Sequence, residues 1–172
     1  MNRKALAFHE AGHAVVARLL SIQIIEATIS PRPEVFIGNV ETQPAASWAR
    51  GKEAICRALE RDIQVSCAGE IAQKIYRPQS LRPHQARQDC ENMFMAAATY
   101  SRLNRFLTGS IDALVERLRK QTVRLVRENW PKVERVAAAL LERGELTQAE
   151  IDAAMAGRRI DRGEPQDARD LA

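Results

Sequence analysis

The chain of 172 residues is poor in aromatic side chains and has no cluster of charge of one sign. Phe, Tyr and Trp together make up 5% of the residues, and the net charge is only +4. Much of that excess comes from the basic residues between 117 and 127, which Glu116 and Glu128 flank. Nucleic-acid-binding surfaces usually combine clustered basic side chains with aromatic rings for stacking. The composition therefore argues against a nucleic-acid partner, and we interpret the 117–127 segment as a solvated helix face.

Cysteines and long apolar runs are also scarce. Cys56, Cys67 and Cys90 are odd in number and have no C-x-x-C spacing, which argues against a disulfide framework and favours a reducing compartment. We interpret Cys90 as a buried free thiol. The most apolar stretch, residues 14–25, contains Arg18 and is too short to span a bilayer, and no signal-peptide core occurs at the N-terminus. We therefore predict a cytoplasmic chain with no membrane span.

One motif near the N-terminus carries chemistry. Residues 9–13 have the H-E-x-x-H spacing of zinc hydrolases. Residues four apart on a helix lie on one face, so the imidazoles of His9 and His13 can converge on a single metal ion. Glu10 is rotated away from the metal, where its carboxylate can reach a water on the ion, which makes it the candidate general base. The motif predicts one Zn²⁺ per chain.

The alternative for this motif is a surface helix with two solvated histidines. The residues that flank it are apolar on nearly all sides, which predicts a buried helix. Gly12 lowers helix propensity by about 1 kcal/mol relative to Ala, so we expect another segment to approach the helix backbone there. A zinc site is favoured over the solvated helix.

The hydrophobic pattern predicts a mainly α-helical domain with a small two-stranded β-sheet. The first strand, residues 24–30, alternates apolar and polar residues, with Ile25, Ala27 and Ile29 on the inner face. The second strand covers 35–42, between two prolines. The predicted helices cover 2–20, 47–76, about 84 to a break at 107–110, 110–130, 131–143 and 147–155. The domain covers 1–156, and the charged tail 157–172 is predicted to be disordered.

Several residues have the character of helix caps or core positions. Ser47 and Ser110 are candidate N-caps, Gly144 is a candidate C-cap, and residues 147–150 form a Thr-x-x-Glu capping box. The Met93–Phe94 stripe in the helix after residue 84 is interpreted as core.

A catalytic zinc needs a third protein ligand and one open position for water. The extended motif with a third histidine six residues downstream is absent, because positions 16 and 19 are Val and Leu. Residue spacing alone leaves His84, the aspartates and glutamates such as Glu26, Glu53 and Glu60 as candidates.

The segment Arg3-Lys4-Ala5-Leu6-Ala7-Phe8-His9-Glu10-Ala11-Gly12-His13-Ala14-Val15-Val16 resembles the peptidase domain of the FtsH-type zinc metalloproteases, which are membrane-bound, ATP-dependent AAA proteases. The resemblance extends over most of residues 3–155. Further segments resemble the family in register. Residues 27–32 resemble the family's strand and Pro-Arg-Gly turn, and 37–40 resemble the family's Leu-Gly-Tyr-Thr strand. Residues 68–72 resemble the family's Gly-Gly-Arg-Ala-Ala helix, and 140–142 and 146–151 resemble the family's closing helices.

The resemblance implies a third ligand. Residues 87–89, Arg-Gln-Asp, are similar to the family's Ser-Asn-Asp segment, whose Asp binds zinc. By that resemblance Asp89 is the third ligand. A lone carboxylate in an otherwise apolar helix would be costly to bury without a partner, which agrees with this role. The alternative is a solvent-facing Asp near a helix N-terminus. His84 follows a proline and is interpreted as a cap or loop residue.

The sequence also departs from the family. It contains no G-x-x-x-x-G-K-[ST] loop. We therefore expect neither a P-loop ATPase module on this chain nor a transmembrane anchor before the motif. The turn at 31–33 reads Pro-Arg-Pro, Gln73 and Lys74 replace an acidic pair, and Trp130-Pro131 interrupts a helix that is continuous in the family.

The predicted function is that of an ATP-independent zinc metalloendopeptidase acting on peptides or unfolded polypeptides. The strand with Phe36, Gly38 and Val40 is expected to offer its edge to an extended substrate by β-augmentation. The alternatives are a regulatory protease of one partner and a zinc-bound interaction module with little or no catalysis. The resemblance also suggests two possible partners: further copies of this chain in a homo-oligomer, or a separately encoded ATPase.

Overall fold

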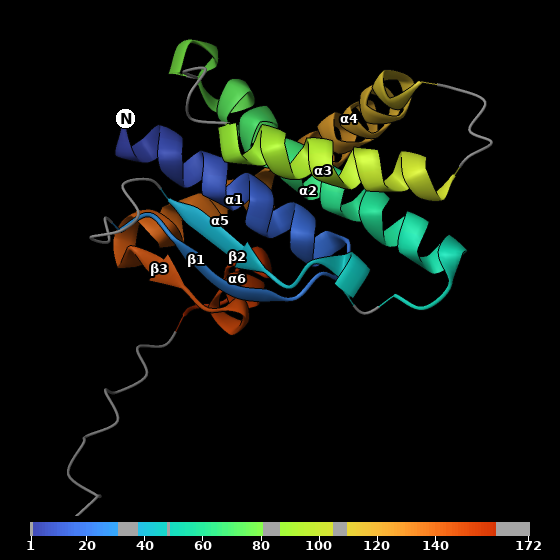
Figure 1. Cartoon of the computed structure of the whole chain (residues 1–172). Helices are drawn as coiled ribbons and strands as arrows, with labels where there is room; N and C mark the ends of the chain where they lie inside the picture. The colour runs from blue at the N-terminus through green and yellow to red at the C-terminus, as the bar shows by residue number, and fades with distance from the viewer. Residues whose placement is uncertain (1, 31–37, 48, 81–86, 105–109, 161–172) are drawn as a thin grey trace, which may run out of the picture.

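The computed structural model describes residues 2–30, 38–47, 49–80, 87–104 and 110–160, and in this part the chain is mainly α-helical with a small antiparallel sheet (Figure 1). This confirms the predicted fold class. The elements in chain order are α1 (Arg3–Leu19), β1 (Ile24–Thr28), β2 (Asn39–Thr42), the 3₁₀ turn η1 (Ala45–Ser47), α2 (Lys52–Tyr76), the 3₁₀ turn η2 (Pro78–Ser80), α3 (Arg87–Leu103), α4 (Ile111–Glu128), α5 (Trp130–Arg143), β3 (Glu145–Leu146) and α6 (Gln148–Met155).

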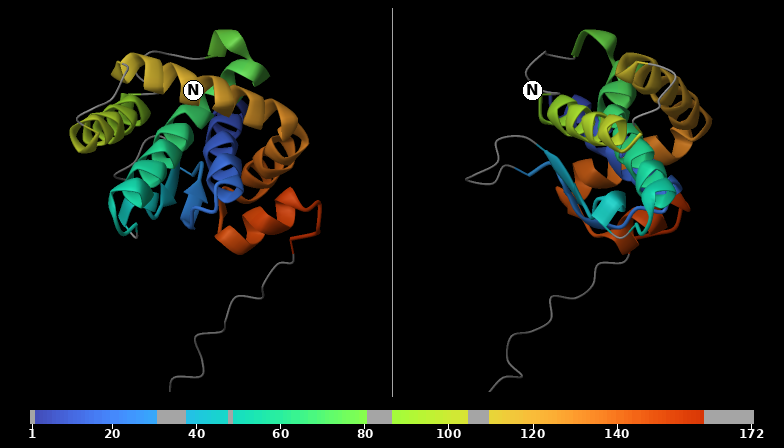
Figure 2. Two further views of the ribbon diagram at one scale, coloured as in Figure 1. Left: turned by 90° about the vertical axis from the view of Figure 1, so that its right-hand side faces the viewer. Right: turned by 45° about the vertical axis from the view of Figure 1, so that its right-hand side comes forward.

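Helix α1 lies inside the molecule, between α2 and α5 (Figure 2). Most of its residues are buried, which confirms the prediction of a buried helix. The close approach expected at Gly12 is made by α2. A Cβ at Gly12 would lie 2.6 Å from the carbonyl oxygen of Ala68 and 2.6 Å from the Cβ of Ala72. Gly12 therefore allows α1 and α2 to pack backbone against backbone.

The sheet has three strands in the order β2-β1-β3, so the prediction of two strands was incomplete. The third strand, β3, is only two residues long and pairs antiparallel with the end of β1. Its length is too short for a period-2 pattern to reveal it in the sequence. The inner face of β1 was also predicted wrongly at Ile25, which is 51% exposed. The pairing with β2 shifts register between Ile24 and Glu26, and this bulge turns Ile25 outward while Ile24 and Ala27 stay buried.

Three of the four predicted helix caps are present. The Ser110 side chain accepts the backbone N–H of Ala113 at the start of α4, Gly144 ends α5 with a φ of 84°, and the Thr147–Glu150 capping box opens α6. Ser47 was predicted wrongly, because it ends η1, and α2 starts five residues later behind Gly51.

Turn η1 is instead held by a side chain of α2. The Asp62 carboxylate accepts the backbone N–H groups of Ala45 and Ala46 at 2.9 and 3.4 Å. Burial raises the pKa of Asp62, and the two N–H groups oppose that rise by favouring the charged carboxylate. The contact ties the segment after β2 to the middle of α2.

Helix α3 is more exposed than the sequence predicted. Ala97 is its one fully buried residue in the structure described, while Phe94 and Met95 are 63% and 60% exposed. The interpretation of Phe94 as core was therefore wrong, and Cys90 is exposed rather than buried. The reason is that α3 packs chiefly on one neighbour, α2, so only a narrow face is covered. Met93 lies on that face and contacts the core.

The structure also bears on the expected membrane spans and on the predicted C-terminal tail. None of the helices in the described ranges combines the length and apolarity needed to cross a bilayer. Helix α6 ends at Met155 as predicted. The predicted tail, 157–172, lies outside the described residues from position 161 onward.

Candidate metal centre

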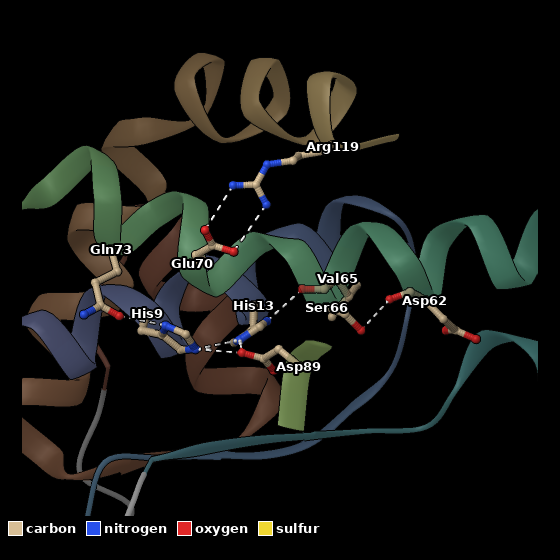
Figure 3. Close-up of polar contacts among 9 residues, drawn as sticks. All are labelled: His9, His13, Asp62, Val65, Ser66, Glu70, Gln73, Asp89 and Arg119. Atoms are coloured by element: carbon tan, nitrogen blue, oxygen red, sulfur yellow. Dashed lines mark hydrogen bonds and ion pairs between the residues drawn. The ribbon is translucent and has the colours of Figure 1, made fainter. Parts of the chain in front are cut away.

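Three side chains from two helices meet at one point (Figure 3). His9 and His13 project from α1, one helical turn apart, and Asp89 reaches them from the first turn of α3. Nε2 of His9 lies 3.1 Å from Nε2 of His13. Oδ2 of Asp89 lies 3.0 Å from Nε2 of His9 and 3.3 Å from Nε2 of His13. The structure thus brings together the three residues that sequence analysis proposed as ligands.

The size of this triangle fits a zinc ion. Tetrahedral zinc binds His nitrogen and carboxylate oxygen at about 2.0–2.2 Å, which separates neighbouring ligand atoms by about 3.3–3.6 Å. The three sides of the triangle are 3.0, 3.1 and 3.3 Å, so one reaches this spacing and the other two are slightly shorter. Two imidazoles and one carboxylate are also a donor set found in catalytic zinc sites, which keep a fourth position open.

The outer nitrogens of both rings are already engaged. Nδ1 of His13 lies 2.7 Å from the carbonyl oxygen of Val65 on α2. Nδ1 of His9 lies 3.0 Å from Oε1 of Gln73, also on α2. Because these oxygens can only accept, both rings hold their proton at Nδ1. When each imidazole is neutral, Nε2 is therefore the nitrogen without a proton, as metal ligation requires.

Gly69 gives the rings their space. A Cβ at this position would lie 2.2 Å from Nε2 of His13 and 2.6 Å from Nε2 of His9. Any side chain there would displace the imidazoles, so the backbone of α2 forms one wall of the site. The sequence could have indicated this wall, because Gly69 lies within a 25-residue helix, where glycine lowers helix stability relative to alanine.

Glu10 is buried beside the triangle, with 2% of its surface exposed. Burial raises its pKa from 4.5 to about 8; the charge of His9 opposes the rise and that of Asp89 adds to it. The neutral form thus dominates at pH 7 in the metal-free protein. A carboxyl group whose pKa lies near neutrality can both accept and release a proton at physiological pH.

The three donors shift one another's pKa values. Burial disfavours charge on His13, but Asp89, through its charge and its hydrogen bond, and the Val65 carbonyl raise the pKa of His13 above its usual value. Burial likewise opposes the charge of Asp89, yet His13 and His9 hold the pKa of Asp89 well below its usual range. A negative carboxylate therefore faces a site that attracts positive charge, whether a proton or a metal ion.

The rival ligands are placed elsewhere. Glu26, Glu53 and Glu60 are not in the group of three donors found among the described residues. Glu60 instead pairs with Arg117 of α4 at 2.7 Å. His84 lies outside the described residues.

The predicted substrate strand is described only in part, because Phe36 lies outside the described residues. Gly38 borders the site: a Cβ there would lie 2.8 Å from Cγ and Oε1 of Glu10. Val40 pairs with Ala27 of β1. Because the strand order is β2-β1-β3, one edge of β2 has no partner strand in the structure described. Binding of a substrate to that edge stays a prediction.

Glu70 shows how α2 is anchored behind the site. Its carboxylate accepts two hydrogen bonds from Arg119 of α4, at 3.1 and 3.2 Å (Figure 3). It also pairs with Lys74. Burial opposes the charge of Glu70, but Arg119 and Lys74 together lower its pKa. These contacts hold the part of α2 that contains Gly69 against α4.

Compared with models of known protein families and with curated proteins, the chain gives no match. The function of the site is therefore inferred from its own geometry and chemistry.

Proposed function

We propose that this chain is an ATP-independent zinc metalloendopeptidase that cleaves peptides or unfolded polypeptides. The observation that carries the proposal is the triangle of His9, His13 and Asp89, whose sides of 3.0 to 3.3 Å are close to the spacing of ligand atoms around zinc. The buried Glu10 beside it adds the group that peptide hydrolysis needs and that a purely structural zinc site does not.

Each residue has a distinct part in this proposal. His9, His13 and Asp89 would hold the ion, which would supply a water of lowered pKa and polarise the scissile carbonyl. Glu10 would accept a proton from the attacking water and pass it to the departing amide nitrogen. Its position supports this role, because it is buried next to two of the proposed ligands, His9 and Asp89, whose charges act on it.

The family assignment is part of the proposal. The H-E-x-x-H helix and the downstream aspartate resemble those of the FtsH-type peptidase domain. The approach of Asp89 from a separate helix to the two histidines supports that resemblance. No phosphate-binding loop occurs in the sequence given, and we propose that peptide hydrolysis at this site needs no ATP.

The position of β2 supports an extended substrate. Gly38, just before the first residue of β2, packs against the side chain of Glu10. Among the described residues, one edge of β2 has no partner strand. An extended peptide could add to this edge through main-chain hydrogen bonds. A folded domain would first have to open, at a cost of about 5–15 kcal/mol, so it should resist cleavage.

The test is digestion of unfolded casein by zinc-loaded protein, with and without ATP, beside a stable folded domain. We expect casein to be cut at the same rate with or without ATP, and the folded domain to survive. Cleavage of no casein at all, with zinc bound, would favour a protease of one partner or an interaction module. Rapid, ATP-stimulated degradation of the folded domain would contradict the proposal. Glu10→Gln is the matched control for contaminating proteases.

A further inference from the structure

We propose that Gln73 and Ser80 form a hydrogen-bond relay that holds the proton of His9 on Nδ1 and so keeps Nε2 free to bind a metal ion. Gln73 and Ser80 are positioning residues, because neither is among the three donors that face the common point. The inference builds on the proposed zinc site, but its decisive observable, the position of one proton on His9, can be measured without zinc.

The relay starts at a backbone carbonyl that can only accept. The hydroxyl of Ser80 donates its single proton to the carbonyl oxygen of Arg77, at 2.7 Å. Oγ of Ser80 must then accept in its other contact, which is with Nε2 of Gln73 at 3.2 Å. This arrangement sets the orientation of the Gln73 amide, with its nitrogen toward Ser80 and its oxygen toward α1.

The relay ends on the ring of His9. Oε1 of Gln73 lies 3.0 Å from Nδ1 of His9, and because an amide oxygen only accepts, Nδ1 must carry the proton. Gln73 is 0% exposed, so no bulk water can replace this contact. The carbonyl of Arg77 at the end of α2 thus selects the tautomer of an imidazole on α1 through two side chains.

The two histidines differ in what holds them. Nδ1 of His13 donates to the backbone carbonyl of Val65, which no substitution of a side chain removes. Nδ1 of His9 depends on a side chain, and hence on the residue type at position 73. His9 is therefore the ligand whose tautomer can be switched by a single substitution, and His13 is an internal reference.

The choice of an amide also matters for charge. Gln73 orients His9 without adding a negative charge, so Asp89 remains the one carboxylate among the three donors. Gln73→Glu would keep an oxygen acceptor for Nδ1 and should preserve the tautomer. Gln73→Leu would keep the volume but remove the acceptor. This pair of variants separates hydrogen bonding from packing.

The experiment measures zinc affinity, by competition with a chelator, and the imidazole N–H signals of protein labelled with ¹⁵N-histidine. We expect the zinc-loaded wild type to show exchange-protected Nδ1–H signals for His9 and His13. Gln73→Leu should lose the His9 signal, keep the His13 signal, and bind zinc about 10–100-fold more weakly. Gln73→Glu should retain both signals and bind zinc at least as tightly as the wild type, because its added negative charge favours a cation.

Matched controls exclude a general loss of structure. Gln148, whose Oε1 accepts the backbone N–H of Ile24, is an amide outside the site, so Gln148→Leu should leave zinc affinity unchanged. Ser80→Ala should weaken zinc binding less than Gln73→Leu. Without Ser80 the side-chain amide of Gln73 can exchange its oxygen and nitrogen by a flip, but its oxygen can still accept from Nδ1 of His9. Ser66→Ala removes a comparable bond from a serine to a carbonyl, that of Asp62, and should have no effect.

Retention of the His9 Nδ1–H signal and of wild-type zinc affinity in Gln73→Leu would overturn the relay. If Gln73→Leu does not fold, unchanged tautomer and affinity in Ser80→Ala would overturn it. If the wild type binds no zinc, the proposed peptidase fails, and the relay is decided on zinc-free protein at about pH 9. There, an Nδ1–H tautomer of His9 that becomes mixed in Gln73→Leu or Ser80→Ala supports the relay, and an unchanged tautomer refutes it.

Discussion

The two helices that supply the donor triangle are held in very different ways. Helix α1, which carries His9 and His13, is packed between α2 and α5 and touches α2 backbone to backbone at Gly12. Helix α3, which carries Asp89, packs chiefly on α2 and buries one residue fully. The rigid helix thus positions two donors and the candidate base, and the peripheral helix brings the third. A bound ion would tie α3 to α1.

The largest expected effect is the loss of the ion when a donor is removed. His13→Ala and Asp89→Ala should each abolish stoichiometric zinc binding, measured by metal analysis after dialysis, because two donors cannot retain the ion as three do. His84→Ala is the control and should keep about one zinc per chain. Full zinc occupancy in Asp89→Ala would remove α3 from the site and direct attention to His84 or a glutamate.

The same site can be disrupted from the α2 side without touching a donor. In Gly69→Ala the new methyl group would lie 2.2 Å from Nε2 of His13, so the imidazoles must shift and zinc binding should be lost. Cys90→Ala, next to Asp89 on exposed α3, should keep the ion. Equal zinc content in both variants would show that α2 does not form the wall of the site.

Replacing the candidate base should separate metal binding from chemistry. In Glu10→Gln the volume is preserved but the side chain cannot accept a proton, so hydrolysis should fall by about 10²–10⁴-fold while zinc stays bound. Turnover of a fluorogenic peptide and metal analysis of the same sample measure the two effects. Undiminished turnover would mean that another group is the base.

Because α2 is buried and α3 is largely exposed, truncating a side chain on α2 should destabilise the protein far more than truncating one on α3. Ile63 on α2 is 0% exposed, and Ile63→Ala should lower the free energy of unfolding by about 2–5 kcal/mol. Phe94 on α3 is 63% exposed, and Phe94→Ala should change it by less than about 0.5 kcal/mol. Urea unfolding of both variants compares the two. A large loss in Phe94→Ala would indicate that this face of α3 is covered in solution.

Glu10→Gln should also raise the free energy of unfolding of the zinc-free protein in a pH-dependent way. Since the pKa of Glu10 is raised from 4.5 to about 8, the zinc-free folded state keeps a proton that the unfolded state has lost, and stability falls as the pH rises through that window. Glu10→Gln should remove this loss. Its stabilisation should be near zero at about pH 4, grow toward pH 8 and level off above it, reaching on the order of 1–4 kcal/mol.

Urea unfolding of zinc-free protein at several pH values measures this difference. Glu128→Gln, at an exposed position at the end of α4, is the control and should show no such trend. A stabilisation by Glu10→Gln that is independent of pH would show that Glu10 is not kept neutral by burial.

Local sequence rules predicted the helices and three caps because each depends on residues a few positions apart. Ser110, Gly144 and the Thr147–Glu150 box act on their own helix ends. The errors arose where a remote segment decided the outcome. Ile25 is turned outward by a bulge in the pairing with β2, and Phe94 is exposed because little besides α2 covers α3.

The sequence by itself determined that His9 and His13 share a face of a buried helix with Glu10 beside them, since the helical period follows from the chain alone. It also supplied Asp89 as the third candidate, by resemblance to a family. Only the tertiary structure decided that Asp89 reaches both imidazoles, that Gly69 leaves room for them, and that Gln73 holds the proton of His9. These contacts join residues 56 to 80 positions apart, and such distances are set by how the helices pack, which local patterns do not encode.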